Sequence, residues 1–470
     1  MPASESSDHR LWAITPLDGR YQSKLQDLGK VVSEGALMAR RLEVEAAWLL
    51  HLGDNEQHTE VVKLSGAVRD KLIELVEQGG DTYVDRVKEI EQTTNHDVKA
   101  VEYTLREILT EVEGGKEALP FIHFGCTSED INNTAYGLML KHLREQVLVP
   151  QMRQMTDWLA RQAEAYCDVP MLSRTHGQAA SPTTLGKELA VFGHRLERQI
   201  SRLEAVEILA KFNGAVGNFN AHLSAFPEVN WTGLAEEFIS YRLGLTYNPY
   251  TTQIENHDGL AEYWGTVQLH NTILIDLCRD LWQYISLGYF KQKVIKGEVG
   301  SSTMPHKVNP IDFENAEGNL GLAGSLIEHF RAKLPISRLQ RDLSDSTVQR
   351  SIGTIAAHSV LAYKMILRGF EKLDLVPARL SEDLNAAYEV LAEPIQTVMR
   401  KRGIANAYEV LKEKTRGKPV TAASLQKLIG ELEGLTDDDR KTLAEMTPAS
   451  YTGLAKTLAT QFAETYNNTL

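Results

Sequence analysis

Three long proline-free intervals constrain the fold of this chain more than any other feature of its sequence. No proline occurs in residues 17–119, 183–226 or 250–304. Because proline removes a helical hydrogen bond and its ring clashes with the preceding turn, such intervals leave room for long uninterrupted helices. Alternating apolar and polar residues flanked by turn residues are scarce. We therefore predict an almost entirely α-helical chain, with any strands short and peripheral.

The second of these intervals shows the clearest helical pattern. Ser181 can cap a helix there, and Pro182 fits the first helical position. Residues 258–292, 311–331 and 346–372 show similar periodicity and are predicted to be long helices. In the second interval, the apolar residues at spacings of three and four are Leu189, Phe192, Leu196, Ile200, Leu203 and Val206.

The length of the chain suggests several domains. At roughly 150 residues per domain, 470 residues correspond to about three domains. We predict an N-terminal helical domain at 1–117, a central bundle of very long helices at 118–370 and a C-terminal helical domain at 371–470. Helices of roughly 25–35 residues seldom bury all of their apolar faces within one chain. Association of such bundles into an oligomer is therefore expected.

Charge and cysteine content narrow the range of partners. The formal net charge of −13 argues against a general binder of nucleic acid or of anionic membranes, because those proteins carry a basic face. No signal peptide and no apolar run of about 18 residues is recognisable, so we expect no membrane partner. Cys126, Cys167 and Cys278 are far apart and odd in number, which favours reduced thiols in the cytoplasm. No HExxH, CxxC or Walker-type motif indicates a metal or nucleoside triphosphate site.

Two loops carry signals for the start of a helix. In the stretch TTNHD, Thr94 and Asp97 fit a capping box, and in the stretch FGCTSED, Thr127 and Asp130 fit another. Capping alone is the simpler interpretation of both. Helix N-termini also bind phosphate and carboxylate through their free N–H groups, however, so capping and ligand binding can share one place.

A third loop, at 172–178, contains His176 in an expected break between helices. A lone histidine is more often a structural or surface group than a catalyst. The neighbouring Gly177 and the polar residues around it favour a general acid or base, because histidine titrates near neutral pH.

The fourth loop is the stretch GSSTMPHKVNP at 300–310. Its simplest interpretation is a flexible connection in which Asn309 caps a helix and Pro310 occupies the first helical position. That interpretation leaves Ser301, Ser302 and Lys307 unexplained, and a linker does not need this combination of groups.

A basic segment at 331–350 stands out in an acidic chain. Five basic residues against two acidic ones give it a net charge of 5 − 2 = +3. Arginine forms bidentate bonds to phosphate and carboxylate, so the segment suits an anionic ligand with several charges. A solvated helix face remains the alternative. The residues are Arg331, Lys333, Arg338, Arg341 and Arg350, against Asp342 and Asp345.

Together these loops resemble those of the fumarase/aspartase superfamily, whose signature is the GSS-x-MP-x-K-x-N pattern at 300–309. Within that superfamily the chain is most similar to the bacterial adenylosuccinate lyase family of purine biosynthesis, and the resemblance extends from residue 16 to residue 449. The stretches that carry it are TTNHDVKAVEY (93–103), FIHFGCTSEDINN (121–133), SRTHGQ (173–178), NGAVGNFNAH (213–222), NPYTTQIE (248–255) and MPHKVNPIDFEN (304–315).

The resemblance implies an all-α, three-domain fold with a long central five-helix bundle. It also implies a homotetramer in the cytoplasm whose active sites are built from loops of three subunits, with no metal or organic cofactor. The implied reaction is anti β-elimination of fumarate from two small molecules, adenylosuccinate and the succinyl-aminoimidazole-carboxamide ribotide.

The same resemblance implies roles for individual residues. Ser301 would be the general base and His176 the general acid, while Lys307 and Asn309 would bind the succinyl carboxylates. The resemblance places phosphate, ribose and nucleotide contacts at Arg20, Tyr21, His96, Arg341, Ser346 and Arg350. Further substrate contacts are expected at Asn95, Asp97, Thr127, Ser128, Gln253, Ser302, Asn315 and Thr347.

Two alternatives stay open at this point. An argininosuccinate lyase-like enzyme would share the base loop but needs no phosphate pocket, so the NHD stretch and the pair Ser346 and Arg350 favour a nucleotide substrate. A non-catalytic, crystallin-like helical protein would have no need to retain Ser301 or His176.

Overall fold

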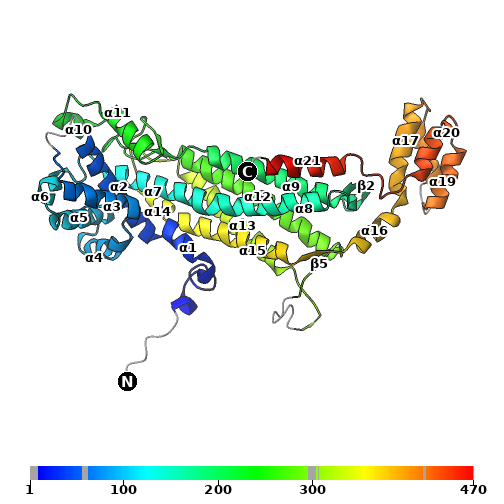
Figure 1. Ribbon diagram of the computed structural model, residues 1–470, viewed down its shortest axis with the longest axis horizontal. Coiled ribbons are helices and arrows are strands. Elements are labelled where there is room, and N and C mark those ends of the chain that lie inside the picture. The colour runs from blue at the N-terminus through cyan, green and yellow to red at the C-terminus, as the bar shows by residue number, and fades with distance from the viewer. Residues whose placement is uncertain (1–8, 56–61, 295–302, 305, 416–419, 469–470) are drawn as a thin grey trace, which may run out of the picture. The chain divides into compact units, whose positions relative to one another are not determined.

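The computed structural model is almost entirely helical, as predicted (Figure 1). It describes residues 9–55, 62–294, 303–304, 306–415 and 420–468. The strands within these residues form three two-stranded sheets, which confirms that strands are short. They are β1 (Pro170–Thr175) with β2 (Gln178–Thr184), β3 (Leu209–Ala210) with β4 (Thr246–Tyr247), and β5 (Phe290–Gln292) with β6 (Leu373–Leu375).

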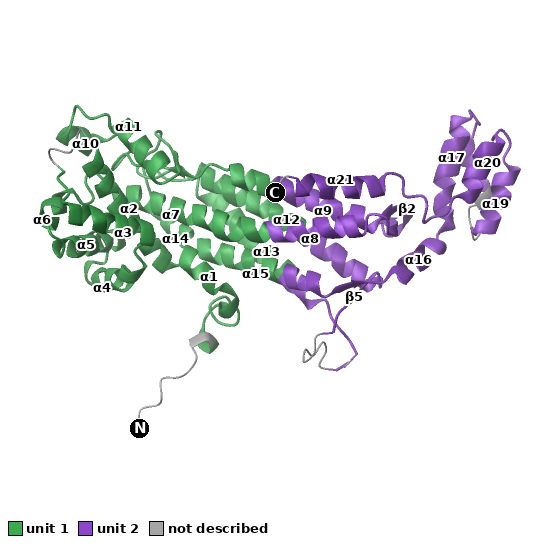
Figure 2. Cartoon of the chain, viewed as in Figure 1, with its two compact units in different colours: residues 1–152, 199–274, 316–364 green, residues 153–198, 275–315, 365–470 purple. Residues whose placement is uncertain are grey.

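The chain divides into two compact units (Figure 2). Unit 1 contains residues 1–152, 199–274 and 316–364, and unit 2 contains residues 153–198, 275–315 and 365–470. Each unit is therefore assembled from three separate stretches of the sequence. None of the described helices is long and apolar enough to cross a membrane.

Helix α2 (Glu34–Asp54) lies at the centre of unit 1, where it packs against several other helices. It begins at Ser33, whose hydroxyl accepts a hydrogen bond from the Ala36 N–H at 3.1 Å. Its Trp48 ring packs 4.5 Å from Phe212 and 5.1 Å from Phe238, measured between ring centroids. Because nearly every residue from Ala36 to Gly53 is buried, α2 forms the core on which the candidate site is built.

The other elements of unit 1 are shorter. Its remaining α-helices are α1 (Gln22–Val32), α3 (Gly66–Gln78), α4 (Val84–Thr94), α5 (Asp97–Thr110), α6 (Gly115–Ala118), α7 (Ser128–His142), α10 (Asn220–Ala225), α11 (Trp231–Glu236) and α14 (Ser344–Gln349). Single turns of other helix types occur at η1 (His9–Trp12), η2 (Asp81–Tyr83), η3 (Leu119–Phe121), η4 (Leu143–Leu148) and η5 (Glu237–Arg242).

In the described part of the chain, five long helices contribute residues to both units, the number that the predicted bundle requires. In unit 1, the Asn271 side-chain amide donates to the Ser359 hydroxyl at 3.0 Å and joins two of them. In unit 2, the Trp158 and Phe370 rings stack with centroids 3.9 Å apart. The helices are α8 (Val149–Ala165), α9 (Leu185–Ala205), α12 (Asp258–Ser286), α13 (Ile311–Lys333) and α15 (Ile352–Glu371).

The apolar stripe predicted in 183–226 is confirmed, because all six of its residues are buried. Two predicted helices end elsewhere than expected. The helix predicted at 258–292 stops at Ser286, since Gly288 adopts a φ of 78° and the next residues pair as β5. The helix predicted at 346–372 is two helices, α14 and α15, with a break at Arg350 and Ser351.

The predicted cap at Ser181 and Pro182 is wrong. Both residues belong to β2, and α9 begins at Leu185, where the Thr184 hydroxyl accepts from the Lys187 N–H at 3.2 Å. The β1–β2 register is interrupted by a bulge opposite Leu172. Proline lacks an N–H and is tolerated at such a bulge, so Pro182 can lie in a strand instead of opening a helix.

The C-terminal part of unit 2 consists of short helices, as predicted. The Asp439 carboxylate accepts from Arg402 Nε at 2.6 Å and from the Thr436 N–H at 3.1 Å, which closes a capping box at the start of one of them. The helices are α16 (Pro377–Asn385), α17 (Ala392–Lys401), α18 (Ala407–Thr415), α19 (Ala422–Glu431), α20 (Asp437–Glu445) and α21 (Ala455–Asn467), with the turn η6 (Tyr388–Leu391).

Candidate functional site

A continuous polar network in unit 1 begins at Arg350, directly after α14. Arg350 Nη1 donates to both carboxylate oxygens of Glu34 at 2.7 Å, and its Nη2 donates to Asp97 at 2.8 Å. Asp97 also accepts from Arg41 Nη2 at 2.9 Å. Burial alone would raise the pKa of Asp97, but the Arg41 and Arg350 guanidiniums and the Val98 N–H hold that pKa below its ordinary value.

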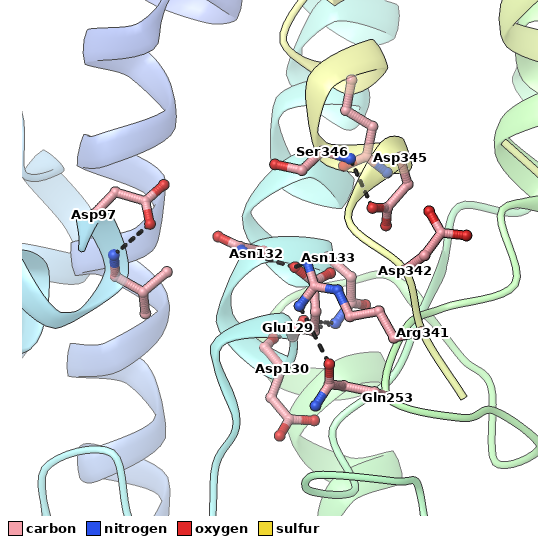
Figure 3. Close-up of polar contacts among 12 residues, drawn as sticks. Asp97, Glu129, Asp130, Asn132, Asn133, Gln253, Arg341, Asp342, Asp345 and Ser346 are labelled. Carbon is pink, nitrogen blue, oxygen red and sulfur yellow. Dashed lines mark hydrogen bonds and ion pairs between the residues drawn. The ribbon is translucent and has the colours of Figure 1, made fainter. Parts of the chain in front are cut away.

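The network continues from Arg41 across α7. Arg41 Nε donates to Asn132 at 2.8 Å, and the Asn132 amide donates to Glu129 at 2.8 Å. The same Glu129 oxygen accepts from Arg341 Nη2 at 3.0 Å, and Arg341 Nη1 lies 3.4 Å from the Gln253 side-chain oxygen (Figure 3). Hydrogen bonds therefore connect segments that are more than 300 residues apart in the sequence.

The start of α7 is fixed by a fully buried ion pair. The Asp130 carboxylate accepts from the Thr127 N–H at 2.8 Å, so the predicted capping box is confirmed. Lys211 Nζ lies 3.0 Å from the same carboxylate, and the Asn213 N–H donates to it at 2.9 Å. A buried charge pair is stable only when its remaining polar atoms are satisfied, as they are here. Thr127 and Ser128 are consequently held half-buried at the N-terminus of α7.

The predicted capping box at Thr94 and Asp97 is wrong. Helix α4 continues through Thr94 and ends at Asn95, which adopts a left-handed φ of 51° that asparagine tolerates well. The cap of α5 is His96, whose Nδ1 accepts from the Lys99 N–H at 3.2 Å. Asp97 is therefore free to direct its carboxylate toward the arginines, while Asn95 and His96 remain exposed.

The basic segment divides into two groups. Arg338 is 83% exposed on its side chain, as a solvated face predicts. Arg341 and Arg350, in contrast, belong to the polar network. Asp342 orders the loop at 338–344, because its carboxylate accepts from the backbone N–H groups of Arg338 at 3.0 Å and Ser344 at 2.8 Å. Ser346 is half-buried and Thr347 is exposed.

His176 lies in unit 2, at the tip of the β1–β2 hairpin and not in a break between helices as expected. His176 and Gly177 have φ values of 53° and 75°, which match a two-residue type I′ turn. The His176 ring is exposed, and the described part of the chain offers it no hydrogen-bond partner. The pairing of β1 with β2 places residues 176 and 177 at the end of the hairpin, and the His176 ring is therefore exposed to solvent.

The signature loop is only partly visible. Ser301 and Ser302 lie outside the described residues. Lys307 is exposed, and Asn309 is half-buried ahead of α13. That helix begins at Ile311, where the periodicity predicted it, and the N–H groups of Phe313 and Glu314 donate to the Pro310 carbonyl. The interpretation with Pro310 at the first helical position placed the start one residue too early.

Three predicted contacts remain to be described, namely Asn315, Arg20 and Tyr21. Asn315 is half-buried in the first turns of α13 in unit 2. Arg20 is exposed just before α1, with its guanidinium carbon 5.9 Å from the centroid of the Tyr21 ring. The Tyr21 N–H is anchored to the Pro16 carbonyl at 2.9 Å.

Residue-by-residue reasoning from the sequence missed Glu34, Arg41 and Glu129. Arg41 and Glu129 are only 2% and 3% exposed. A charged residue inside an apolar helix was the available signal, since such residues are seldom buried without a partner. Arg41 Nη1 and Arg341 Nε are buried and have no hydrogen-bond partner among the described residues.

Comparisons with known proteins identify relatives over nearly the whole chain. Residues 10–323 match the family described as Lyase, and residues 337–452 match the family described as Adenylosuccinate lyase C-terminal. The chain is 52% identical over 445 residues to the adenylosuccinate lyase of Vibrio cholerae serotype O1, covering 95% of this chain and 97% of that protein. It is 50% identical over 448 residues to the adenylosuccinate lyase of Escherichia coli strain K12, covering 95% and 98%.

Solved structures share the fold at lower identity. The 3-carboxy-cis,cis-muconate lactonizing enzyme from Pseudomonas putida aligns with a TM-score of 0.73 at 22% identity, covering 94% of this chain and 97% of that one. A fumarate lyase from Mesorhizobium sp. BNC1 aligns with a TM-score of 0.72 at 18% identity, covering 93% and 97%.

Proposed function

The chain belongs to the adenylosuccinate lyase family, and we propose that it eliminates fumarate from adenylosuccinate to give AMP. We propose the same elimination for the succinyl-aminoimidazole-carboxamide ribotide. The observation that carries the proposal is the polar network of unit 1. It joins four of the predicted segments through Asp97, Glu129, Gln253 and the pair Arg341 and Arg350. Arginine donors gathered in this way suit a ligand that bears a phosphate and carboxylates.

The elimination needs both a base and an acid. A base removes a proton from the carbon next to one succinyl carboxylate, which leaves an aci-carboxylate dianion. The bond between the neighbouring carbon and the purine-side nitrogen then breaks, and an acid delivers a proton to that nitrogen. The products are fumarate and the nucleotide, so no oxidant or further reactant is required.

We assign the base to Ser301. A serine hydroxyl is a weak base unless positive potential stabilises its alkoxide, and Lys307 of the same loop can supply that potential. Lys307 and Asn309 are also the proposed contacts for the succinyl carboxylates, where they would stabilise the developing dianion. Loss of one such preorganised donor typically lowers the rate by about 10²–10³-fold.

We assign the acid to His176. An exposed imidazole at the tip of a two-residue turn can reach a ligand that approaches from solvent. Histidine changes protonation near neutral pH, and general acid catalysis typically contributes about 10²–10⁴-fold.

The anionic nucleotide end is assigned to the network of unit 1. Arg341 and Arg350 each form ion pairs with a carboxylate of the chain. A substrate phosphate can replace those carboxylates as the partner of the guanidinium groups, because phosphate accepts bidentate bonds in the same geometry. The other proposed contacts are Arg20, Tyr21, Asn95, His96, Asp97, Thr127, Ser128, Gln253, Ser302, Asn315, Ser346 and Thr347.

We also propose a cytoplasmic homotetramer of three-domain subunits, with domains at 1–117, 118–370 and 371–470, whose active sites combine loops of different subunits. Large apolar side chains exposed on the long helices support association. Leu269 is 43% exposed, Trp282 is 42% exposed and Leu322 is 55% exposed. Long amphipathic helices usually bury such side chains against another helix or subunit.

The test follows ultraviolet absorbance as purified protein acts on adenylosuccinate. Ser301→Ala and His176→Ala are each expected to lower the rate by hundreds-fold, within the range of about 10²–10⁴-fold for acid–base groups. Size-exclusion chromatography with light scattering would confirm that both variants still form tetramers. Cleavage of argininosuccinate in place of adenylosuccinate would refute the phosphate assignment, and inactivity on both would favour a structural role.

A further inference from the structure

A buried polar cluster connects α14 to the loop at 248–257. It consists of Glu255, His257, Asp345 and Gln349, which are 3%, 4%, 2% and 4% exposed. None of these residues belongs to the site described above. Polar groups are rarely buried to this extent unless their hydrogen bonds are satisfied, so their arrangement indicates a specific role.

His257 bridges two carboxylates. Its Nε2 lies 3.5 Å from an Asp345 oxygen, and its Nδ1 lies 3.9 Å from a Glu255 oxygen. The Glu255 carboxylate is itself fixed, because it accepts from the backbone N–H of His257 at 2.7 Å and from the side-chain amide of Asn248 at 3.0 Å. The loop at 248–257 therefore forms a rigid platform that directs the imidazole toward α14.

Two contacts connect this platform to α14. The first is the pair of His257 Nε2 with Asp345, and the second is the Gln349 side-chain amide, whose nitrogen can donate to His257 Nδ1 at 3.3 Å. Asp345 and Gln349 are four residues apart, so they lie on one face of the helix. His257 therefore contacts both the first and the last turn of α14.

The proposed phosphate contacts directly follow the two anchored residues. Asp345 accepts from the Ser346 N–H at 2.7 Å, as Figure 3 shows, and Gln349 immediately precedes Arg350. Burial would raise the pKa of Asp345, but its contacts with His257 and the Ser346 N–H hold that pKa below its ordinary value. The positions of Ser346 and Arg350 therefore depend on the face of α14 that His257 holds.

Side chains do not completely fill the space beside this face of α14. A small cavity of about 30 Å³ adjoins the cluster and is lined by Glu255, His257 and Gln349 together with Asn133 and Tyr136. That volume is sufficient for a buried water. His257 itself adopts a φ of 62°, in the left-handed region that residues other than glycine seldom occupy, although histidine, asparagine and aspartate do so more often than most. This backbone conformation occurs at the residue whose imidazole contacts α14.

We propose that His257 and Asp345 are positioning residues that hold α14 so that Ser346 and Arg350 meet the phosphate end of the nucleotide. The pair sets the affinity for the nucleotide and does not take part in the elimination step. This inference rests on the proposed function, because it uses the assignment of Ser346 and Arg350 to the phosphate.

Two variants test the pair. In His257→Asn the imidazole is removed, while asparagine keeps the left-handed backbone accessible. In Asp345→Asn the carboxylate charge is removed, while the amide oxygen can still accept from the Ser346 N–H. Asp439→Asn is the matched control, because Asp439 is also a buried aspartate that accepts from a backbone N–H at a helix start and pairs with a cation.

Steady-state kinetics on adenylosuccinate should separate binding from chemistry. Each variant is expected to raise KM by roughly tenfold, as the loss of a hydrogen bond to a charged group typically does, with kcat changed less than about threefold. The double variant should be no worse than the more severe single variant, because both remove the same contact. The control should lower Tm and leave KM unchanged.

Protection by AMP gives a readout that does not depend on turnover. AMP should raise the Tm of the wild type, and a roughly tenfold higher AMP concentration should be needed for the same rise in either variant. A fall in kcat with unchanged KM would overturn the inference, as would equal protection of wild type and variants by AMP. If the wild type binds AMP but does not cleave adenylosuccinate, the proposed function fails, and the AMP comparison alone decides the positioning role.

Discussion

Arg41 and Arg350 share a single carboxylate oxygen of Asp97, at 2.9 Å and 2.8 Å. One of these arginines comes from a buried position in α2, and the other lies at the end of α14. A carboxylate that lies between two cations offsets the repulsion between them. The two guanidinium groups can therefore lie closer together than they could without it. This bridge links the core of unit 1 to the proposed phosphate contacts.

Removing Arg41 is expected to destabilise the protein strongly. Arg41→Met leaves Asp97 with one cation and leaves Asn132 without its donor. Breaking a buried ion pair by removing one partner typically costs about 3–5 kcal/mol. Urea unfolding followed by circular dichroism would measure the loss. Arg338→Met is the matched control and should change the free energy of unfolding by no more than about 0.5 kcal/mol, because Arg338 is largely exposed.

Removing the bridging charge is expected to weaken nucleotide binding. In Asp97→Asn, the Arg350 guanidinium loses its ion pair with residue 97 and is held by Glu34 alone. We expect a rise of about tenfold or more in KM for adenylosuccinate, equal to about 1.4 kcal/mol of lost binding. Glu34→Gln, at the more exposed partner of Arg350, should have a smaller effect. Equal effects of the two variants on KM would contradict a special role for the bridge.

The long helices could be predicted because their signals are local and repeated. Apolar periodicity predicted α13 to within two residues of its observed end. The failures occurred where distant segments decide the local structure. Ser181 and Pro182 carry a good helix start signal, but strand pairing with residues 170–175 overrides it. No local rule indicates that outcome.

In the candidate site, too, the local motifs could be predicted and the contacts between distant segments could not. The resemblance identified loops with chemical groups, and four of these segments meet in the network of unit 1. The pairing of Arg41 with Asp97 could not be predicted, because ion pairs between distant segments leave no periodic pattern. The same is true of His257, whose partner Asp345 lies 88 residues later in the chain.

Acidification is expected to destabilise the protein partly through His222. Its ring is buried between Phe219 and Trp231, and burial lowers its pKa to about 4 from an ordinary value of 6.5. Between these two values the unfolded chain binds the proton more readily, so the free energy of unfolding falls as pH drops from about 6.5 to about 4. The full loss from this group is on the order of 3 kcal/mol.

His222→Leu should make the free energy of unfolding less dependent on pH. Denaturation at several pH values would show a shallower slope in this range for the variant, by the equivalent of one proton. Other buried histidines, among them His270, also have lowered pKa values and will leave a residual slope. An unchanged slope would show that His222 takes up its proton in the folded protein at an ordinary pH.

The close approach of Gly125 to His222 makes a final prediction possible. Gly125 adopts a φ of 72°, and a Cβ added there would lie 2.4 Å from His222 Nε2. Gly125→Ala therefore combines an unfavourable backbone conformation with a steric clash in the turn that precedes α7. Gly403 has a nearly equal φ of 71° with no atom within 4 Å of an added Cβ, so Gly403→Ala isolates the backbone cost. That cost should be about 1 kcal/mol.

We expect Gly125→Ala to exceed the control by a further 1–3 kcal/mol or so, as overpacking of a filled interior typically does. The clash falls on His222, which cannot move without disturbing its contact with Trp231, at 4.7 Å between ring centroids. The double variant Gly125→Ala/His222→Ala should recover part of the difference, because the smaller side chain makes room for the new methyl group. If the double variant shows no recovery in urea unfolding, the cost of Gly125→Ala comes from its backbone and not from the packing of His222 against the turn.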